Sequence, residues 1–138
     1  MIGYQYTGSN APVIYGASSD LSFYADMDGD GSMECYRYYL SGGTVYEAVV
    51  QGSGCASSIL TATGQPITAS LESKGLSVTS LTFTYYDADT QGGALLSAPL
   101  TGTNLYLVRR VDVAATVKGV TSTTPFTIDT QAVVRAGR

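Results

Sequence analysis

The residues best suited to chemistry lie in one acidic run, YADMDGDGSMECYRYY at 24–39. Calcium prefers about six to eight oxygen ligands, and a D-x-D-x-D-G run supplies a carboxylate from every second residue around a tight glycine turn. Carboxylates packed this densely repel one another, and a plain turn does not require that density. The run predicts a calcium site whose ligands are Asp26, Asp28, Asp30, the backbone carbonyl of Ser32, and either Glu34 or a distant carboxylate.

The run matches only the first half of an EF-hand loop. With Asp26 as the first position, Arg37 occupies the twelfth, where an EF-hand has a bidentate glutamate, and strand-like residues replace its exiting helix. Turn chemistry alone is the alternative interpretation, because Asp and Gly favour tight reversals. A second acidic pair, Asp87 and Asp89, either completes the coordination or, as is more common, begins a turn of its own.

The chain has two cysteines, Cys35 and Cys55. An even count, with the pair flanking an apparent hairpin, is typical of a disulfide formed in an oxidising compartment. Closing a loop of this length stabilises a fold by about 3 kcal/mol in the chain-entropy estimate. We expect the disulfide, with two buried thiols as the alternative.

The composition excludes several classes of function. Without histidine the chain can form neither a Ser-His-Asp triad nor a His-ligated zinc or iron site. A paired-carboxylate glycosidase is the chemistry still open, but the sequence indicates no substrate cleft. With 7 basic against 11 acidic residues, the chain lacks the clustered positive charge that nucleic acid or an anionic bilayer requires. We therefore predict that the protein is not an enzyme and that it has no nucleic-acid partner.

Composition and length predict the fold class. Gly, Ser, Thr, Tyr and Val dominate, and there are few of the Glu, Lys and Arg runs that build exposed helices. A chain of 138 residues has the usual size of one domain, and no stretch approaches the roughly 20 apolar residues of a membrane helix. We predict a single mainly β domain of the α+β pilin-like type over 1–138, with an irregular lead-in at 1–19.

Alternating apolar and polar residues locate the strands. The predicted strands are 20–26, both arms of a hairpin at 34–50, 76–87, 105–119 and a last one in FTIDTQAVVR at 126–135. An irregularity is expected near Ser80; 51–70 is expected to be a loop, and 67–75 to hold the only helical turn. The total is an antiparallel sheet of about six or seven strands with little helix, and its apolar face needs a cover that the sequence does not supply as a helix.

Four segments together resemble a known family. They are LSFYADMDGDGSMECYRYYLSGGTVYEAV, LSVTSLTFTYYDADTQGG, LVRRVDVAATVKG and TPFTIDTQAVVRAGR. Their order and spacing, over roughly 20–138, resemble the globular part of bacterial type IV pilin-like proteins. The closest resemblance is to the minor pilins and pseudopilins of the PilW-like kind, and it rests on the order of the segments, since no single motif is diagnostic.

The resemblance implies a fold and a route of assembly. Members of that family are made as prepilins, cleaved by a prepilin peptidase, and held in the inner membrane by a long apolar N-terminal helix before they enter a filament. That helix packs on the antiparallel sheet of the head, and some heads carry calcium in a loop. The leader peptide and the helix are absent from this sequence, and we expect their removal to explain the sheet without a covering helix.

The first hypothesis is therefore a non-enzymatic filament subunit, the soluble head of a type IV pilus minor pilin or type II secretion pseudopilin. Its partners would be other pilin or pseudopilin subunits at the cell surface, and it would reach the inner membrane only through the missing helix. The alternative is a free-standing extracellular β-sandwich module for binding or adhesion. Tyr36, Tyr38 and Tyr39 can form a sugar-binding platform, although tyrosines are also ordinary strand formers.

Overall fold

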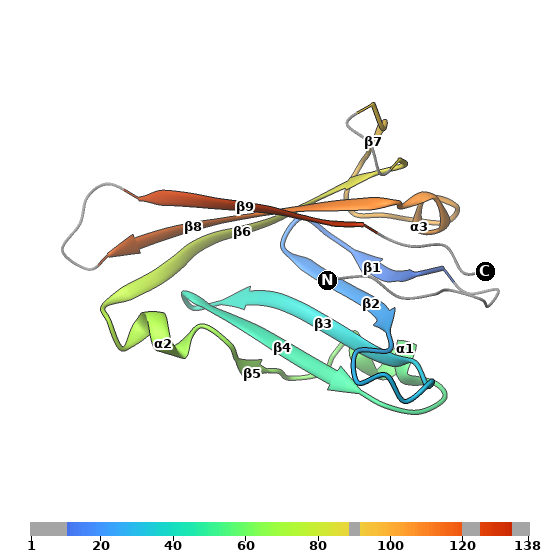
Figure 1. Cartoon of the computed structure of the whole chain (residues 1–138), viewed down its shortest axis with the longest axis horizontal. Coiled ribbons are helices and arrows are strands. Elements are labelled where there is room, and N and C mark those ends of the chain that lie inside the picture. The colour runs from blue at the N-terminus through green and yellow to red at the C-terminus, as the bar shows by residue number, and fades with distance from the viewer. Residues whose placement is uncertain (1–10, 89–91, 120–124, 134–138) are drawn as a thin grey trace.

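The computed structural model describes residues 11–88, 92–119 and 125–133. Within these ranges there are nine strands, which form two antiparallel sheets, and three short helices (Figure 1). The prediction of a mainly β fold is confirmed. The sequence did not show what covers the apolar face of the predicted sheet. In the structure the strands form two sheets, and each sheet buries its apolar face against the other.

The first sheet has the order β1-β2-β3-β4-β5. Its strands are β1 (Val13–Gly16), β2 (Asp20–Ala25), β3 (Glu34–Ser41), β4 (Thr44–Val50) and β5 (Gln65–Pro66). The strand predicted at 20–26 and the hairpin predicted at 34–50 are confirmed. Gly42 and Gly43 turn the hairpin with φ values of 58° and 83°, a backbone region that favours glycine.

The second sheet has the order β7-β6-β8-β9. Its strands are β6 (Leu76–Tyr86), β7 (Leu95–Leu96), β8 (Arg110–Gly119) and β9 (Phe126–Val133). The register between β6 and β8 shifts between Val78 and Ser80, which confirms the predicted irregularity. The C-terminal hairpin is confirmed as β8 and β9.

Three predictions about local structure were wrong. The lead-in at 1–19 contains β1, whose alternation is hidden by a register shift between Val13 and Tyr15. The loop predicted at 51–70 contains β5, too short to show a period, and helix α1 (Cys55–Ile59), which buries only its two end residues. The strand predicted at 105–119 begins only at Arg110, because the preceding residues form helix α3 (Asn104–Leu107).

The helical turn predicted at 67–75 is confirmed as α2 (Ala69–Glu72), although it is not the only one. All three helices in the described part of the chain are short, and none of them has the length and apolarity to cross a bilayer. They fill corners of the sandwich. Helix α1 packs on β3 and β4, and α2 lies where the chain passes from the first sheet to β6 (Figure 1).

The main core lies between the two sheets. Leu21, Phe23 and Tyr36 of the first sheet meet Phe83 and Tyr85 of the second. Tyr85 is fully buried, and its hydroxyl donates a hydrogen bond to the Ala17 carbonyl at 2.7 Å. A buried phenol needs such a partner, and this bond ties the two sheets together at the turn after β1. The predicted metal residues lie on the loop that leaves this core after β2.

Candidate metal centre

The acidic run forms the connection between β2 and β3. Ala25 and Glu34 are paired at the end of the β2–β3 ladder, so both ends of the connection are fixed by the sheet. Asp26, Asp28 and Asp30 lie on the connection itself, and Glu34 is the first residue of β3. The ladder thus brings the end of the run back to its beginning.

The structure brings four carboxylates together. One oxygen from each of Asp26, Asp28, Asp30 and Glu34 lies within 4.8 Å of the others. The sequence left open whether Glu34 or a distant carboxylate completes the group, and among the described residues the fold supplies Glu34. This set of oxygen ligands can hold a hard metal cation.

Hydrogen bonds inside the loop hold the carboxylates in place. Asp26 accepts the N–H groups of Gly29 and Asp30 at Oδ1, at 2.9 and 3.1 Å, and that of Gly31 at Oδ2, at 3.0 Å. Asp28 Oδ1 accepts from Asp30 N–H at 3.1 Å. Gly29 and Gly31 have φ values of 75° and 88°, which allows the backbone to curl around Asp26. The loop is therefore a tight turn, as the alternative interpretation predicted. The same turn brings the carboxylates together, so it is compatible with a metal site.

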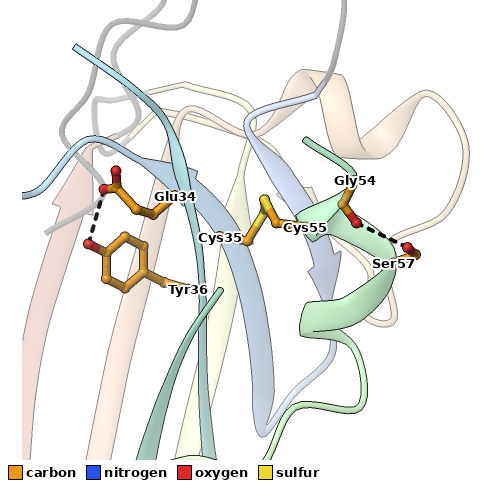
Figure 2. Close-up of a disulfide and its surroundings, with 6 residues drawn as sticks. All are labelled: Glu34, Cys35, Tyr36, Gly54, Cys55 and Ser57. Atoms are coloured by element: carbon orange, nitrogen blue, oxygen red, sulfur yellow. Dashed lines mark hydrogen bonds between the residues drawn. A yellow bond between two sulfur atoms is a disulfide. The ribbon is translucent and has the colours of Figure 1, made fainter. Parts of the chain in front are cut away.

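Glu34 differs from the three aspartates in its burial. Glu34 is only 3% exposed, whereas Asp28 and Asp30 are exposed. Its Oε2 accepts a hydrogen bond from the Tyr36 hydroxyl at 3.4 Å (Figure 2). A buried carboxylate is costly unless it is paired or bound to a metal. The two ion pairs among the described residues lie elsewhere, so a cation in this loop would offset that cost.

The predicted disulfide joins Cys35 and Cys55, whose Cα atoms are 5.8 Å apart. Cys35 follows Glu34 directly and points to the opposite face of β3 (Figure 2). There the bridge packs with Ala48 and Ile59 in a small apolar cluster under α1. The disulfide and the acidic loop therefore meet at one end of β3, on opposite faces of the sheet.

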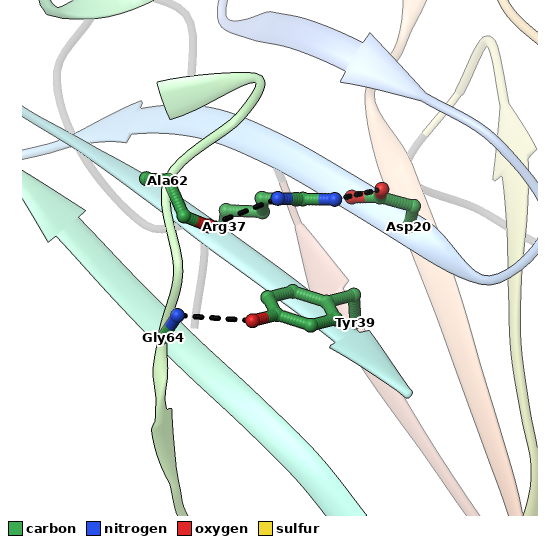
Figure 3. A network of polar contacts seen from close by, with 5 residues as sticks. All are labelled: Asp20, Arg37, Tyr39, Ala62 and Gly64. Carbon is green, nitrogen blue, oxygen red and sulfur yellow. Dashed lines mark hydrogen bonds and ion pairs between the residues drawn. The ribbon is translucent and has the colours of Figure 1, made fainter. Parts of the chain in front are cut away.

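Arg37 stands where an EF-hand has its last ligand, and the structure gives it another role. Its Nε and Nη2 donate to the two oxygens of Asp20 at 3.0 and 2.7 Å, and its Nη1 donates to the Ala62 carbonyl at 2.9 Å (Figure 3). The guanidinium lies 4.2 Å from the centre of the Tyr39 ring, whose hydroxyl accepts from Gly64 N–H at 2.9 Å. Arg37 thus clamps the 62–64 segment onto the first sheet.

Asp87, the described member of the second acidic pair, does not belong to the carboxylate group of the metal centre. Asp87 Oδ1 accepts from Ala94 N–H at 2.7 Å, and Asp87 N–H donates to the Ala94 carbonyl at 3.1 Å, so Asp87 closes its own turn. Asp89 lies outside the described residues. The three tyrosines named as a sugar-binding platform do not lie on one surface, since Tyr39 stacks on Tyr46 at 5.4 Å between ring centres. Tyr36 and Tyr38 stack on Phe23 against the core, at 5.7 and 5.8 Å between ring centres.

Packing of the tyrosines predicts how stability depends on alkaline pH. Burial, followed by the Glu34 carboxylate, raises the pKa of Tyr36 from 10.0 to about 12. Burial, followed by the hydrogen bond to Glu47, raises the pKa of Tyr38, and burial raises that of Tyr85. In the unfolded chain these phenols ionise near pH 10. Between pH 10 and about 12 the folded state therefore holds more protons than the unfolded state, and the free energy of unfolding falls as the pH rises.

Thermal unfolding between pH 9 and pH 12, followed beside the tyrosinate absorbance, measures this fall. The Tyr36→Phe variant should lose stability less steeply over the same window, because it lacks one of the phenols whose pKa is raised by folding. If the melting temperature falls as steeply with pH in the variant as in the wild type, Tyr36 ionises in the folded state as it does in the unfolded chain.

Neither a family model, nor a curated protein, nor a solved structure matches the chain. The class of protein therefore follows from the fold and the site alone. The chain is a disulfide-linked domain of two antiparallel sheets, with an acidic loop at one end of β3 whose four carboxylates can hold a metal ion.

Proposed function

We propose that the protein is a non-enzymatic structural subunit, the head of a surface filament of the type IV pilin-like kind, and that its acidic loop binds calcium. The single observation that carries the filament role is an apolar surface on the core face of the second sheet that the first sheet leaves open. The group of four carboxylates in the acidic loop supports the calcium site. The resemblance of four sequence segments to minor pilins and pseudopilins connects the filament role with the calcium site, since some heads of that family carry calcium in a loop.

The open apolar surface lies at the β8–β9 side of the second sheet. Ile128 is paired with Ala115, and Ala115 with the buried Leu81, so all three side chains point to the core face. Ile128 is nevertheless 53% exposed, and Ala115 and Val113 are only half-buried. The β9 strand thus extends beyond the cover that the first sheet provides. An apolar helix laid across this face, as the resemblance implies, would bury these side chains.

Calcium fits the loop better than other cations do. All the side-chain ligands are carboxylate oxygens, which suit hard cations, and no histidine or free cysteine is present for a softer metal. Asp26, Asp28, Asp30 and Glu34 occupy the first, third, fifth and ninth positions of a calcium loop, and the Ser32 carbonyl occupies the seventh. The loop is irregular and exposed, which suits the flexible coordination of calcium more than the strict octahedron of magnesium.

Calcium and a disulfide both suit a protein that works outside the cytoplasm. Disulfides persist in oxidising environments, and loop sites in extracellular modules bind calcium at the concentrations found there. The proposed setting is therefore the cell surface, with other pilin or pseudopilin subunits as partners. A free-standing extracellular binding module would share these properties, but it would have no apolar helix to cover the open face of the second sheet.

The full-length protein in its natural host tests the filament role. Its gene should encode a prepilin cleavage site and about 20 apolar residues ahead of this domain. Ile128→Asp, which places a charge on the open apolar face, should reduce the recovery of surface filaments. Thr127→Asp places the same charge on the outer face of β9 and should leave recovery unchanged. Equal recovery of filaments from both variants, or a gene without the apolar segment, would favour the free-standing module.

A further inference from the structure

Strand β9 is the one long and regular edge strand among the described residues. The edges of the first sheet are β1, with four residues and a register shift, and β5, with two. In the second sheet β7 has two residues, whereas β9 has eight in unbroken register with β8. Short or irregular edges resist pairing, and proline or lysine on an edge blocks it. The β9 sequence, FTIDTQAV, contains neither residue.

The backbone of β9 is suited to accept another strand. Every second residue of an antiparallel edge strand directs its N–H and C=O away from its partner. No described segment pairs with the side of β9 that faces away from β8. An extended peptide placed there continues the sheet by main-chain hydrogen bonds, and its side chains alternate between the two faces. The two faces of β9 therefore decide which peptide fits.

The outer face of the second sheet carries an acidic groove beside β9. The groove has a volume of about 430 Å³ and is lined by Thr84, Asp112, Val113, Ala114, Asp129 and Thr130. Asp112 is paired with Thr84, and Ala114 with Asp129, so these four side chains share the outer face. The small Ala114 leaves space between the two carboxylates. The lining itself contains no lysine or arginine, but the neighbouring Arg110 donates from Nε to Asp112 Oδ1 at 2.9 Å. Asp129 is therefore the carboxylate that favours a ligand bringing positive charge and hydrogen-bond donors.

The other face of β9 favours an apolar neighbour. Ile128 is 53% exposed there, beside the half-buried Ala115 with which it is paired. A strand added to β9 would thus direct every second side chain to the acidic groove and the remaining ones to the apolar side. The residue pattern that fits is an alternation of basic and apolar residues.

We propose that β9 binds an extended segment of a partner protein in which basic and apolar residues alternate, with the basic side chains at Asp129 and the apolar ones beside Ile128. This interaction depends neither on the calcium loop nor on a filament. A helix on the core face contacts the side chains of β9, whereas the added strand contacts the backbone edge with which no described segment pairs. The two modes of packing are therefore compatible.

Charge argues against a second copy of this chain as the occupant. In an antiparallel pair of two β9 strands, opposite residues share a face, so the two Asp129 carboxylates come close together on the outer face. Like charges in such positions destabilise a strand pair. The formal net charge of −4 on each copy adds to the repulsion.

Synthetic peptides test the proposal on the isolated domain. The probe is an acetylated and amidated octapeptide of alternating lysine and valine, and binding is followed by amide NMR shifts and hydrogen exchange. We expect the changes to concentrate in β9 and in the groove residues of β6 and β8. The same peptide with glutamate in place of lysine should not bind. Two further forms, N-methylated at all lysines or at all valines, each block one edge of the peptide, so one form should bind and the other should not.

Charge variants of the protein locate the contact. Asp129→Lys replaces an attraction with a repulsion and should weaken binding by about fivefold to tenfold. Asp28→Lys changes the net charge equally but lies in the loop of the other sheet, and it should weaken binding much less. Equal weakening by both variants, equal behaviour of the two N-methylated peptides, or binding away from β9 would overturn the proposal. None of these results bears on calcium binding, which is measured without the peptide.

Discussion

Calcium is expected to raise the apparent free energy of unfolding of this domain by about 2.7 kcal/mol when its free concentration is a hundred times Kd. The reason is linkage: the folded loop gathers the oxygens of Asp26, Asp28, Asp30 and Glu34 within 4.8 Å, and the unfolded chain disperses them. For a domain of 138 residues, an increase of this size raises the melting temperature by roughly 10 °C. Thermal unfolding under non-reducing conditions, with calcium and with a chelator, measures the shift.

The Asp28→Ala variant is the decisive comparison. Asp28 is exposed and has one hydrogen bond within the loop, to Asp30 N–H, so its loss should change the calcium-free protein little. The variant should nevertheless lose most of the shift on adding calcium. Asp87→Ala removes a carboxylate that only closes its own turn, and this matched control should respond to calcium as the wild type does.

Magnesium separates a calcium site from a general attraction for divalent cations. At equal concentration it should give a much smaller shift, since it requires a near-octahedral site and gives up its water reluctantly. If calcium shifts the wild type and Asp28→Ala equally, the carboxylates do not bind the ion as a group. The run DMDGDG is then a turn, and the proposed filament role would rest on the open apolar face alone.

Most of what the sequence predicted correctly depends on neighbours along the chain. The alternation of Leu21, Phe23 and Ala25 gives the buried face of β2, and glycines at 42 and 43 give the hairpin turn. The break near Ser80 was visible because the apolar residues change parity there. The acidic cluster was predictable for the same reason, since its members lie within nine residues.

The features that could not be predicted depend on contacts between distant segments. Glu34 was one of two options for the metal centre, and only the pairing of Ala25 with Glu34 returns it to the aspartates. Ile128 has the parity of a core residue, yet it is 53% exposed, because the overlap of the two sheets decides what is covered. Helix α3 has the alternating Leu105 and Leu107 of a strand, and its true conformation follows from where the chain turns into β8.

Loss of the disulfide should produce the other large effect, a decrease of about 3 kcal/mol in the free energy of unfolding. The bridge closes a loop with a sequence separation of 20, and without it the unfolded chain gains the corresponding conformational freedom. Because Cys35 is fully buried and Cys55 is 5% exposed, replacement of both by alanine is the appropriate variant. Serine would add the separate cost of two hydroxyl groups in the apolar cluster with Ala48 and Ile59.

Urea unfolding of the Cys35→Ala, Cys55→Ala variant, beside the oxidised and the reduced wild type, measures the effect. The midpoint should fall by about 1–3 M, and the reduced wild type should resemble the variant. Calcium should still shift the variant, because the β2–β3 ladder fixes the acidic loop independently of the bridge, which lies on the opposite face of β3. If the variant loses calcium binding as well as stability, the bridge positions Glu34, and the two sites form one cooperative unit at the end of the strand.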